Sequence, residues 1–453
     1  MNTTEASSEY TAQTEAPPAG ITISAKEREM FQILHQKLIK MMDLSVLSSM
    51  KSDEARRKIR QIAEGIVAEE QMPLNLAARQ RLVKQVADEI LGLGPLEPLL
   101  ADPTISDILV NSSNTVYVER NGRLHLTDVT FQDDAHLLHI IDRIVSSVGR
   151  RIDESSPMVD ARLKDGSRVN AIIRPLALDG PMLSIRRFAV NPLKMEDLIK
   201  YGTVQPAVAQ LLTAIVKARL NMIISGGTGA GKTTLLNVLS GYIPEGERLI
   251  TIEDSAELQF QHDHLVRLET RPPNVEGKGQ VAQRDLVRNA LRMRPDRIII
   301  GEVRGAESLD MLQAMNTGHD GSLTTIHANS PRDALTRVEN MVSMTGFEMP
   351  LASVRSQIAS AVHVVLQLER LDDGTRKLVS VQEINGMEGD IVTMSEIFAY
   401  KRSGVASDGK VIGSFQATGI VPVFYDRLRR RGIDISREIF DPRHETEERI
   451  AYG

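Results

Sequence analysis

The nine residues Gly226–Thr234, with the sequence GGTGAGKTT, constrain the fold of this chain more than any other segment. They match the pattern G-x-x-x-x-G-K-[ST], an apolar stretch at 221–225 precedes them, and helical spacing follows over 232–239. A strand that turns through glycines into a helix N-terminus presents backbone N–H groups to phosphate oxygens. The segment therefore predicts a loop that binds a nucleoside triphosphate such as ATP, through Gly226, Gly227, Thr228, Gly229, Ala230, Gly231, Lys232, Thr233 and Thr234.

Two side chains of this loop have separate predicted roles. The ammonium of Lys232 neutralises charge on the β- and γ-phosphates, and the hydroxyl of Thr233 binds Mg²⁺. ATP and Mg²⁺ are thus the predicted cofactors. The alternative is a glycine-rich turn from strand to helix that binds no ligand, and it is disfavoured because every position of the pattern is filled.

Composition excludes several kinds of protein. The chain has 54 basic and 60 acidic residues, so a protein that coats nucleic acid with positive charge is disfavoured, and we expect no stable nucleic-acid binding. Aromatic residues make up only 4%, which leaves few platforms for stacking bases and disfavours a DNA translocase. The chain has no cysteine, which excludes disulfides, thiolate zinc sites and cysteine nucleophiles and suits a reducing cytoplasm.

No stretch of the sequence approaches the ~20 apolar residues of a membrane span. The first residues, Met1–Gly20, are acidic and hydroxyl-rich where a signal peptide has a basic end and an apolar run. We expect a soluble, cytoplasmic protein that reaches a membrane only through its partners. Its 453 residues leave room for about three domains of ~100–200 residues each.

Changes in periodicity divide the chain into five predicted segments. The first residues are rich in Thr, Ser, Ala, Glu and Pro and offer little to bury, which is typical of disorder. Three amphipathic stretches follow, the third with Asn75 as its N-cap, and then short strands with a hairpin turn at Asn121 and Gly122. The predicted segments are a disordered tail at 1–23, a three-helix bundle at 24–94, an α+β domain at 95–188, a linker at 189–203 and a nucleotide-binding domain at 204–453.

Strand and helix patterns alternate through the last segment, which predicts an α/β fold with a mostly parallel sheet covered by helices. Ligands of such sheets bind at the carboxyl ends of the strands. The predicted strands are 221–225, 249–252, 297–300 and 323–326, and the predicted helices are 232–239, 284–291 and 309–315.

The strand at 297–300 delivers Glu302 to this predicted binding edge. Its carboxylate is placed to orient an attacking water and to accept the proton of that water. Many P-loop proteins carry an aspartate directly before such a glutamate, whereas this chain has Gly301. We therefore expect Mg²⁺ to depend on Thr233, on waters and on a contact from Glu302. The alternative is a surface glutamate without a catalytic role.

A second carboxylate group follows the strand at 249–252 and consists of Glu253, Asp254 and Glu257. Because parallel strands end at one edge of a sheet, this group is expected beside Glu302. The sequence leaves open which carboxylate is the general base and which binds the waters of Mg²⁺. We rank Glu302 first and Glu253 second.

Two of the chain's ten histidines, His319 and His327, flank the strand at 323–326. Their place in the nucleotide-binding sheet favours a sensor of the γ-phosphate. A structural role is the alternative for each. A zinc site is disfavoured further, because the chain has no cysteine and no H-x-x-x-H pattern on a helix.

Arginines are concentrated near the end of the α+β domain, at Arg168, Arg174, Arg186 and Arg187. Exposed arginines on a strand face are the ordinary explanation. If this domain folds over the nucleotide, one of them acts as an arginine finger, which is worth ~10³–10⁵ in rate. A further basic run at 427–431 is expected to face solvent or a partner from a C-terminal helix.

Four motifs in this order resemble the secretion-superfamily ATPases that drive type II and type IV secretion and type IV pili. They are GGTGAGKTT, TIEDSAEL, LRMRPDRIIIGEVRG and GHDGSLTTIHANSPRDAL, which correspond to the Walker A motif, Asp box, Walker B motif and His box of that family. The CpaF/TadA branch, the motors of tight-adherence (Flp, type IVc) pili, is especially similar to RLETRPPNVEGKGQVAQRDLVRN and SIRRF. The resemblance covers roughly residues 90–400.

The resemblance implies a cytoplasmic homohexamer in which each subunit joins a PAS-like domain to a RecA-like ATPase domain, with nucleotide between the two. A chain without cysteine lacks the tetracysteine zinc module of many related motors, which fits the CpaF/TadA branch. The matching positions are Lys232 and Thr233 in Walker A, Glu253 and Glu257 in the Asp box, Glu302 in Walker B, and His319 and His327 in the His box, with Arg168, Arg186 and Arg187 in the region of the phosphate-contacting arginines.

The predicted function is therefore a motor that couples ATP hydrolysis to assembly of a tight-adherence pilus through inner-membrane platform proteins. The sequence leaves open whether the same motor also retracts the pilus. One alternative is a VirB11-like ATPase of a type IV secretion system. Another is a nucleotide-gated scaffold that binds ATP with little turnover.

Overall fold

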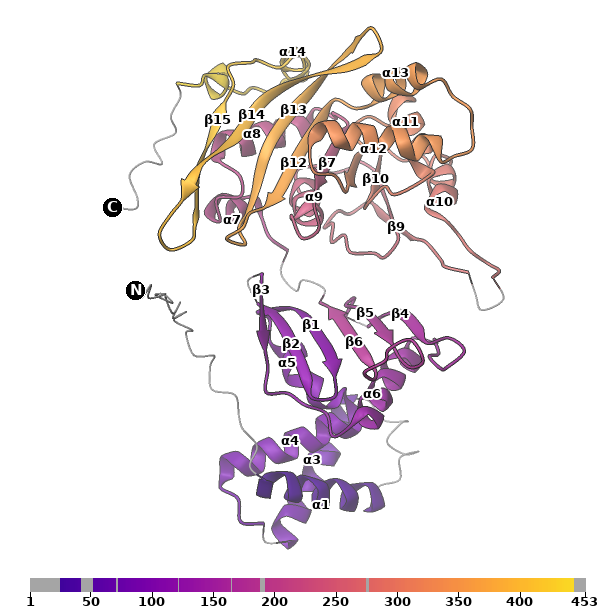
Figure 1. Cartoon of the computed structure of the whole chain (residues 1–453), viewed down its shortest axis with the longest axis vertical. Helices are drawn as coiled ribbons and strands as arrows, with labels where there is room; N and C mark the ends of the chain where they lie inside the picture. Colours follow the sequence, from indigo (N-terminus) through magenta and orange to yellow (C-terminus); the bar gives the residue numbers. More distant parts are fainter. Residues whose placement is uncertain are drawn as a thin grey trace, which may run out of the picture. The chain divides into compact units, whose positions relative to one another are not determined.

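The computed structural model describes residues 25–41, 52–70, 72–120, 122–163, 165–187, 192–273 and 277–443, and the chain forms two compact units, Met1–Phe188 and Ala189–Gly453 (Figure 1). Each unit has its own hydrophobic core. The predicted disordered tail at 1–23 lies outside the described residues. Within the described ranges, no helix has both the length and the hydropathy needed to cross a membrane.

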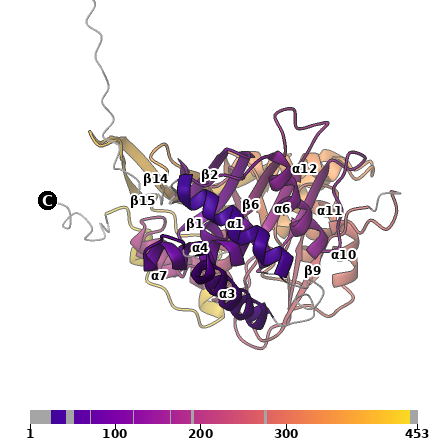
Figure 2. The same cartoon turned by 90° about the horizontal axis from the view of Figure 1, so that it is seen from below.

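Three helices begin the first unit: α1 (Ala25–Met41), α3 (Ser52–Glu69) and α4 (Leu76–Leu91). Leu34 and Leu38 of α1 share one buried core with Ile66 of α3 and Val86 of α4, and Figure 2 shows α1 lying against the other two helices. The side chain of Asn75 accepts a hydrogen bond of 2.8 Å from the backbone N–H of Ala78, which confirms the predicted N-cap.

The rest of the first unit is a six-stranded antiparallel sheet in the order β3-β2-β1-β6-β5-β4. Arg120 pairs with Arg123 across the predicted hairpin turn, so that hairpin is confirmed. Apolar residues alternate along the strands, and one face packs on α6, as Leu137 and Ile141 show. The elements are η1 (Gly94–Leu96), α5 (Glu97–Ala101), β1 (Ile105–Ser112), β2 (Thr115–Arg120), β3 (Arg123–Leu126), α6 (Asp134–Ser147), β4 (Met158–Arg162), β5 (Arg168–Ile172) and β6 (Met182–Arg186).

The second unit contains a nine-stranded sheet in the order β15-β14-β13-β12-β7-β11-β10-β8-β9. The six strands from β12 to β9 in this order are parallel, and the four predicted strands are confirmed to within one residue at each end. These six are β7 (Met222–Gly226), β8 (Leu249–Glu253), β9 (Leu265–Glu269), β10 (Arg297–Ile300), β11 (Leu323–Ile326) and β12 (Val364–Arg370).

Helices cover both faces of this sheet, which explains why its central strands β7, β8, β10 and β11 are buried at every position. In β7, Met222 and Ile224 belong to one core cluster and Ile223 to the other. The first cluster includes α7 (Met195–Lys200), α8 (Pro206–Lys217), α9 (Lys232–Ser240), α14 (Tyr425–Arg430) and η2 (Arg437–Phe440). The second includes α10 (Gln283–Ala290), α11 (Glu307–Asn316), α12 (Pro331–Ser343) and α13 (Leu351–Ala361).

Three long antiparallel strands extend the sheet beyond β12, and the sequence pattern did not predict them. They are β13 (Arg376–Glu388), β14 (Ile391–Val405) and β15 (Val411–Ala417). β13 folds back directly on β12 through a short turn at 371–375. The α/β fold class is confirmed, with a mixed rather than a wholly parallel sheet.

Candidate functional site

The predicted phosphate-binding loop connects the end of β7 to the start of α9. Gly229 has a φ of +70° and Gly231 a φ of +97°, values in the left-handed region that favours glycine. A side chain at Gly226 would place its Cβ 2.6 Å from the carbonyl oxygen of Leu368 on β12. The glycines of the pattern are therefore required by the backbone of this loop and by the strand beside it.

Lys232 lies at the N-terminus of α9 and reaches back into the loop. Its Nζ donates to the carbonyl oxygens of Gly226 at 2.9 Å and Gly227 at 3.0 Å. Burial lowers the pKa of Lys232, and the negative charge of Glu302 offsets part of that effect. The ammonium is thus held at the mouth of the loop, where phosphate oxygens would replace the two carbonyls as acceptors.

The loop and the predicted carboxylates meet at one edge of the sheet. Ile326 of β11 pairs with Ser225 of β7, and Ile300 of β10 pairs with Ile252 of β8, so all four strands end together. Glu302 follows one of these ends directly. The structure therefore brings together the loop, the group around Glu253, Glu302 and His327, as the sequence predicted.

Glu253 is 3% exposed at the end of β8. Its Oε2 accepts hydrogen bonds from the backbone N–H groups of Glu257 at 2.6 Å and Leu258 at 2.8 Å. Its Oε1 is buried and has no hydrogen-bond partner among the described residues. Burial raises the pKa of this carboxyl to about 7, against the two backbone hydrogen bonds that lower it. A carboxyl with this pKa exchanges a proton readily near neutral pH.

The side chain of Glu253 explains why residue 301 is a glycine. A Cβ at Gly301 would lie 3.0 Å from Cγ of Glu253 and 3.6 Å from its Oε2. The buried glutamate of β8 thus occupies the space into which an aspartate on β10 would project. The missing aspartate before Glu302 is explained by a carboxylate supplied from the neighbouring strand.

Glu302 has a different environment from Glu253. Nη2 of Arg304 donates to its Oε2 at 2.7 Å, and Nη1 of Arg304 lies 3.6 Å from Asp254. Burial alone would raise the pKa of Glu302, but the hydrogen bond from Arg304 and the charges of Arg304, Lys232 and His327 outweigh it and lower the pKa. Glu302 therefore stays ionised and binds cations better than it binds a proton. Arg304 was not predicted as a site residue.

The residues present fit an Mg²⁺ ion that arrives with nucleotide. No group of three or more His, Asp or Glu side chains in the described part of the chain could hold a metal ion by itself. Mg²⁺ typically takes one or two protein oxygens and completes its shell with phosphate and water. Thr233 and Glu302 supply such oxygens at the loop edge, and Glu257 enters this site through its backbone N–H.

The structure has His319 and His327 at the two ends of β11, as predicted, which places them at opposite edges of the sheet. His319 precedes β11 and His327 follows it, so this strand, whose four residues span roughly 13 Å, separates the two histidines. Only His327 lies at the loop edge. Nδ1 of His319 lies 3.3 Å from the carbonyl oxygen of Ala314, and its own carbonyl accepts a hydrogen bond from Ser322. The residues before and after a strand look alike in sequence, although they lie at opposite edges of the sheet.

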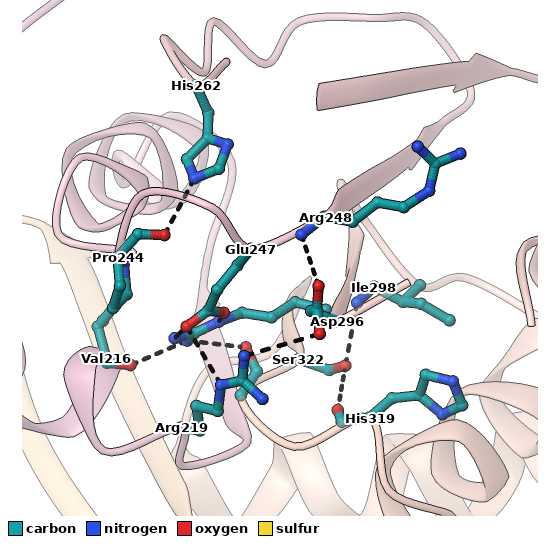
Figure 3. Close-up of polar contacts among 12 residues, drawn as sticks. Val216, Arg219, Pro244, Glu247, Arg248, His262, Asp296, Ile298, His319 and Ser322 are labelled. Atoms are coloured by element: carbon teal, nitrogen blue, oxygen red, sulfur yellow. Dashed lines mark hydrogen bonds and ion pairs between the residues drawn. The ribbon is translucent and has the colours of Figure 1, made fainter. Parts of the chain in front are cut away.

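A buried ion-pair network occupies that opposite edge, where the strands begin (Figure 3). Arg297 is fully buried, and its Nε and Nη2 donate to Glu247 at 2.6 and 3.2 Å. Arg219 donates to the same carboxylate at 3.1 Å and lies 3.8 Å from Asp296. The network joins the segments that precede β8 and β10 and so fixes the register on which the loop edge depends.

The predicted arginines of the first unit have three different environments. Arg168 and Arg186 pair across β5 and β6 and are exposed, within 3.5 Å of Asp160 and 3.2 Å of Asp107. Arg187 donates to the carbonyl oxygens of Asp102 and Ile105, which ties it to its own unit. Arg174 is exposed after β5. Contact of any of these four with phosphate stays a prediction.

Comparison with known proteins places this geometry in a family context. Residues 89–421 match the family described as type II/IV secretion system protein. A Mycobacterium tuberculosis protein assigned by name to conjugal transfer is 40% identical over 67% of this chain and 87% of its own length. The type IV secretion system protein VirB11 of Brucella suis is 31% identical over 66% of this chain and 90% of its own length. The crystal structure of the Brucella suis VirB11 ATPase in complex with sulphate covers 64% of this chain and 95% of its own, with 29% identity and a TM-score of 0.35.

Proposed function

This chain belongs to the type II/IV secretion system protein family, and we propose that it is a VirB11-like ATPase that couples ATP hydrolysis to transport through a type IV secretion system. The observation that carries the proposal is the meeting of the phosphate-binding loop, Lys232, Glu253 and Glu302 at one edge of the sheet. A loop of this kind without carboxylates beside it would bind nucleotide but would lack a base for hydrolysis.

The structure favours a division of work between the two glutamates that reverses the order expected from sequence. We assign the general base to Glu253, because its pKa of about 7 suits it to take a proton from water near neutral pH. Glu302, with its lowered pKa, holds a negative charge and orients Arg304. His327 lies close enough to lower the pKa of Glu302 electrostatically, which suits a residue that responds to the γ-phosphate.

The loop supplies binding and charge. Its backbone N–H groups and the N-terminus of α9 surround the phosphates, and the ammonium of Lys232 moves from two loop carbonyls to phosphate oxygens. Mg²⁺, when bound through Thr233 and Glu302, would neutralise the charge that develops on the transferred phosphoryl group. The carboxyl of Glu253 is the proposed acceptor of the proton that the attacking water loses.

The names of the similar proteins favour type IV secretion over the pilus role. Two relatives match this chain over most of their own length, and they are named for conjugal transfer and for type IV secretion. The tight-adherence pilus motor is the second candidate, because Arg267–Asn289 and Ser184–Phe188 resemble the CpaF/TadA branch. Both candidates share a cytoplasmic homohexamer that is peripheral to the inner membrane through its partners.

Genetic complementation in the native host separates these candidates. A deletion strain would carry the wild-type gene, Glu302→Ala, or the matched control Glu348→Ala, whose glutamate is exposed in the loop between α12 and α13. If the proposal is right, Glu302→Ala abolishes transfer of a type IV secretion substrate, and tight-adherence pili are still assembled. Loss of pili with normal transfer would support the pilus motor, and normal transfer and pili with Glu302→Ala would contradict both candidates.

A nucleotide-gated scaffold is the remaining alternative from another functional class. It predicts ATP binding with little phosphate release, whereas the proposed motor turns over repeatedly. The raised pKa of Glu253 favours turnover, because a scaffold has no use for a base poised near neutral pH.

A further inference from the structure

The turn between β12 and β13 places two arginines beside the phosphate-binding loop. β12 lies on the opposite side of β7 from β10, as Figure 1 shows, and Leu368 pairs with Gly226 at the last residue of β7. β12 continues to Arg370, and β13 begins at Arg376. The two arginines pair directly across the strands.

Arg376 contacts the loop, and Arg370 lies close to it. Nε of Arg376 donates to the carbonyl oxygen of Gly229 at 2.9 Å. A Cβ at Gly229 would lie 3.5 Å from Nη1 of Arg370, and a Cβ at Gly231 would lie 3.5 Å from Cδ of Arg376. The loop therefore lies beside guanidinium groups from a distant part of the chain. Arg376, for example, follows Gly229 by 147 residues.

The position of the carboxylates orients the nucleotide on the loop. Glu302 and Glu253 follow β10 and β8, which lie beyond β11 on one side of β7. The γ-phosphate must face that side to be hydrolysed, since the base and the water are there. A nucleotide with its γ-phosphate on the β11 side directs its ribose and base toward the other side, where Arg370 and Arg376 lie.

An exposed aromatic residue lies beside the start of β13. The segment that follows α7 is fixed to β13, because Lys377 donates to the carbonyl oxygen of Gly202 and Leu378 donates to that of Thr203 at 2.9 Å. Tyr201, directly before this segment, is 59% exposed. β13 thus holds this aromatic residue in the neighbourhood of Arg376.

We propose that Arg370 and Arg376 bind the nucleoside end of ATP, with the planar guanidinium of Arg376 packed against the base. The inference rests on the proposed ATPase function and adds to it the residues that recognise the base and ribose. Guanidinium planes stack on aromatic rings and attract their π-electrons.

Titration calorimetry with three ligands tests this inference: ATP, ADP and inorganic tripolyphosphate, which lacks the nucleoside. The variants are Arg370→Ala, Arg376→Ala and Arg376→Gln, the last of which keeps an N–H donor for Gly229. The matched control is Arg429→Ala, an exposed arginine of α14, whose residue Arg427 pairs with Asp320 at the opposite edge of the sheet. Circular dichroism and thermal unfolding of each variant establish that it is folded.

We expect each of the three loop-side variants to weaken ATP and ADP equally, by about tenfold, while tripolyphosphate and the control are unchanged. Equal weakening of tripolyphosphate would overturn the inference, since the arginines would then act on the phosphates or on the loop itself. Wild-type affinity of all three variants for ATP would also overturn it and leave the ATPase intact. Wild-type protein that binds neither ATP nor tripolyphosphate would contradict the proposed function, and the inference with it.

Discussion

Replacing Glu253 by glutamine changes stability and catalysis in opposite directions. The wild-type carboxyl is buried with one oxygen that lacks a hydrogen-bond partner, and burial raises its pKa from 4.5 to about 7. Glutamine has nearly the same shape, and its carbonyl oxygen can accept the two N–H groups of Glu257 and Leu258. The variant therefore removes the ionisable group while the packing is kept.

The effect on stability depends on pH in a defined direction. Between pH 4.5 and about 7 the folded wild-type protein holds a proton on Glu253 that the unfolded chain has released. The free energy of unfolding therefore falls as pH rises through this window, by about 3 kcal/mol for such a difference in pKa. The glutamine variant lacks this loss. The free energy of unfolding of the variant minus that of wild type should therefore be about 3 kcal/mol larger at pH 8 than at pH 4.

Urea unfolding of both proteins at several pH values between 4 and 8 measures this difference directly. Glu348→Gln is the matched control, because it makes the same chemical change in an exposed side chain of the loop between α12 and α13. Phosphate release by Glu253→Gln should fall by about 10²–10⁴ if Glu253 is the general base. A stability difference that does not change with pH, or hydrolysis at the wild-type rate, would refute the reasoning.

Three further substitutions test other parts of the site. Gly301→Ala forces Cγ of Glu253 to move, so we expect a loss of about 1 kcal/mol in urea unfolding and slower hydrolysis; a wild-type rate would contradict the close contact. Arg297→Met removes two of the hydrogen bonds that the Glu247 carboxylate accepts and leaves Arg219 as its cationic partner, so thermal and urea unfolding should show a loss of about 3 kcal/mol, and a loss below about 1 kcal/mol would count against the network. Arg304→Ala removes the hydrogen bond that lowers the pKa of Glu302, so an NMR titration of the Glu302 carboxyl should move to higher pH; an unmoved titration would dissociate the two residues.

Local patterns in the sequence predicted the parts of the site that lie close together along the chain. The loop at Gly226–Thr234 and the strands that end beside Glu253 and Glu302 are short, apolar and bounded by glycine or charge, and the structure has them within one residue. The same patterns placed these carboxylates at one edge, because parallel strands share a direction.

Other features depend on contacts that a single sequence does not contain. The position of His319 was predicted from its nearness to β11, although the two ends of a strand point to opposite edges of the sheet. The fit of Gly301 to Glu253 joins neighbouring strands that are far apart in the chain. Arg376 follows Gly229 by 147 residues, and the two are brought together by the antiparallel strand β13, which the sequence pattern did not predict.

Steady-state phosphate release by the purified full chain tests the central claim most directly, with wild type and Lys232→Ala compared in the presence and absence of Mg²⁺. Lys232 reaches into the loop, and loss of one such preorganised charge is worth about 10²–10³ in rate. The account predicts Mg²⁺-dependent turnover of ATP by wild type and a rate at least about 100-fold lower for the variant. Hydrolysis by Lys232→Ala at the wild-type rate would contradict it.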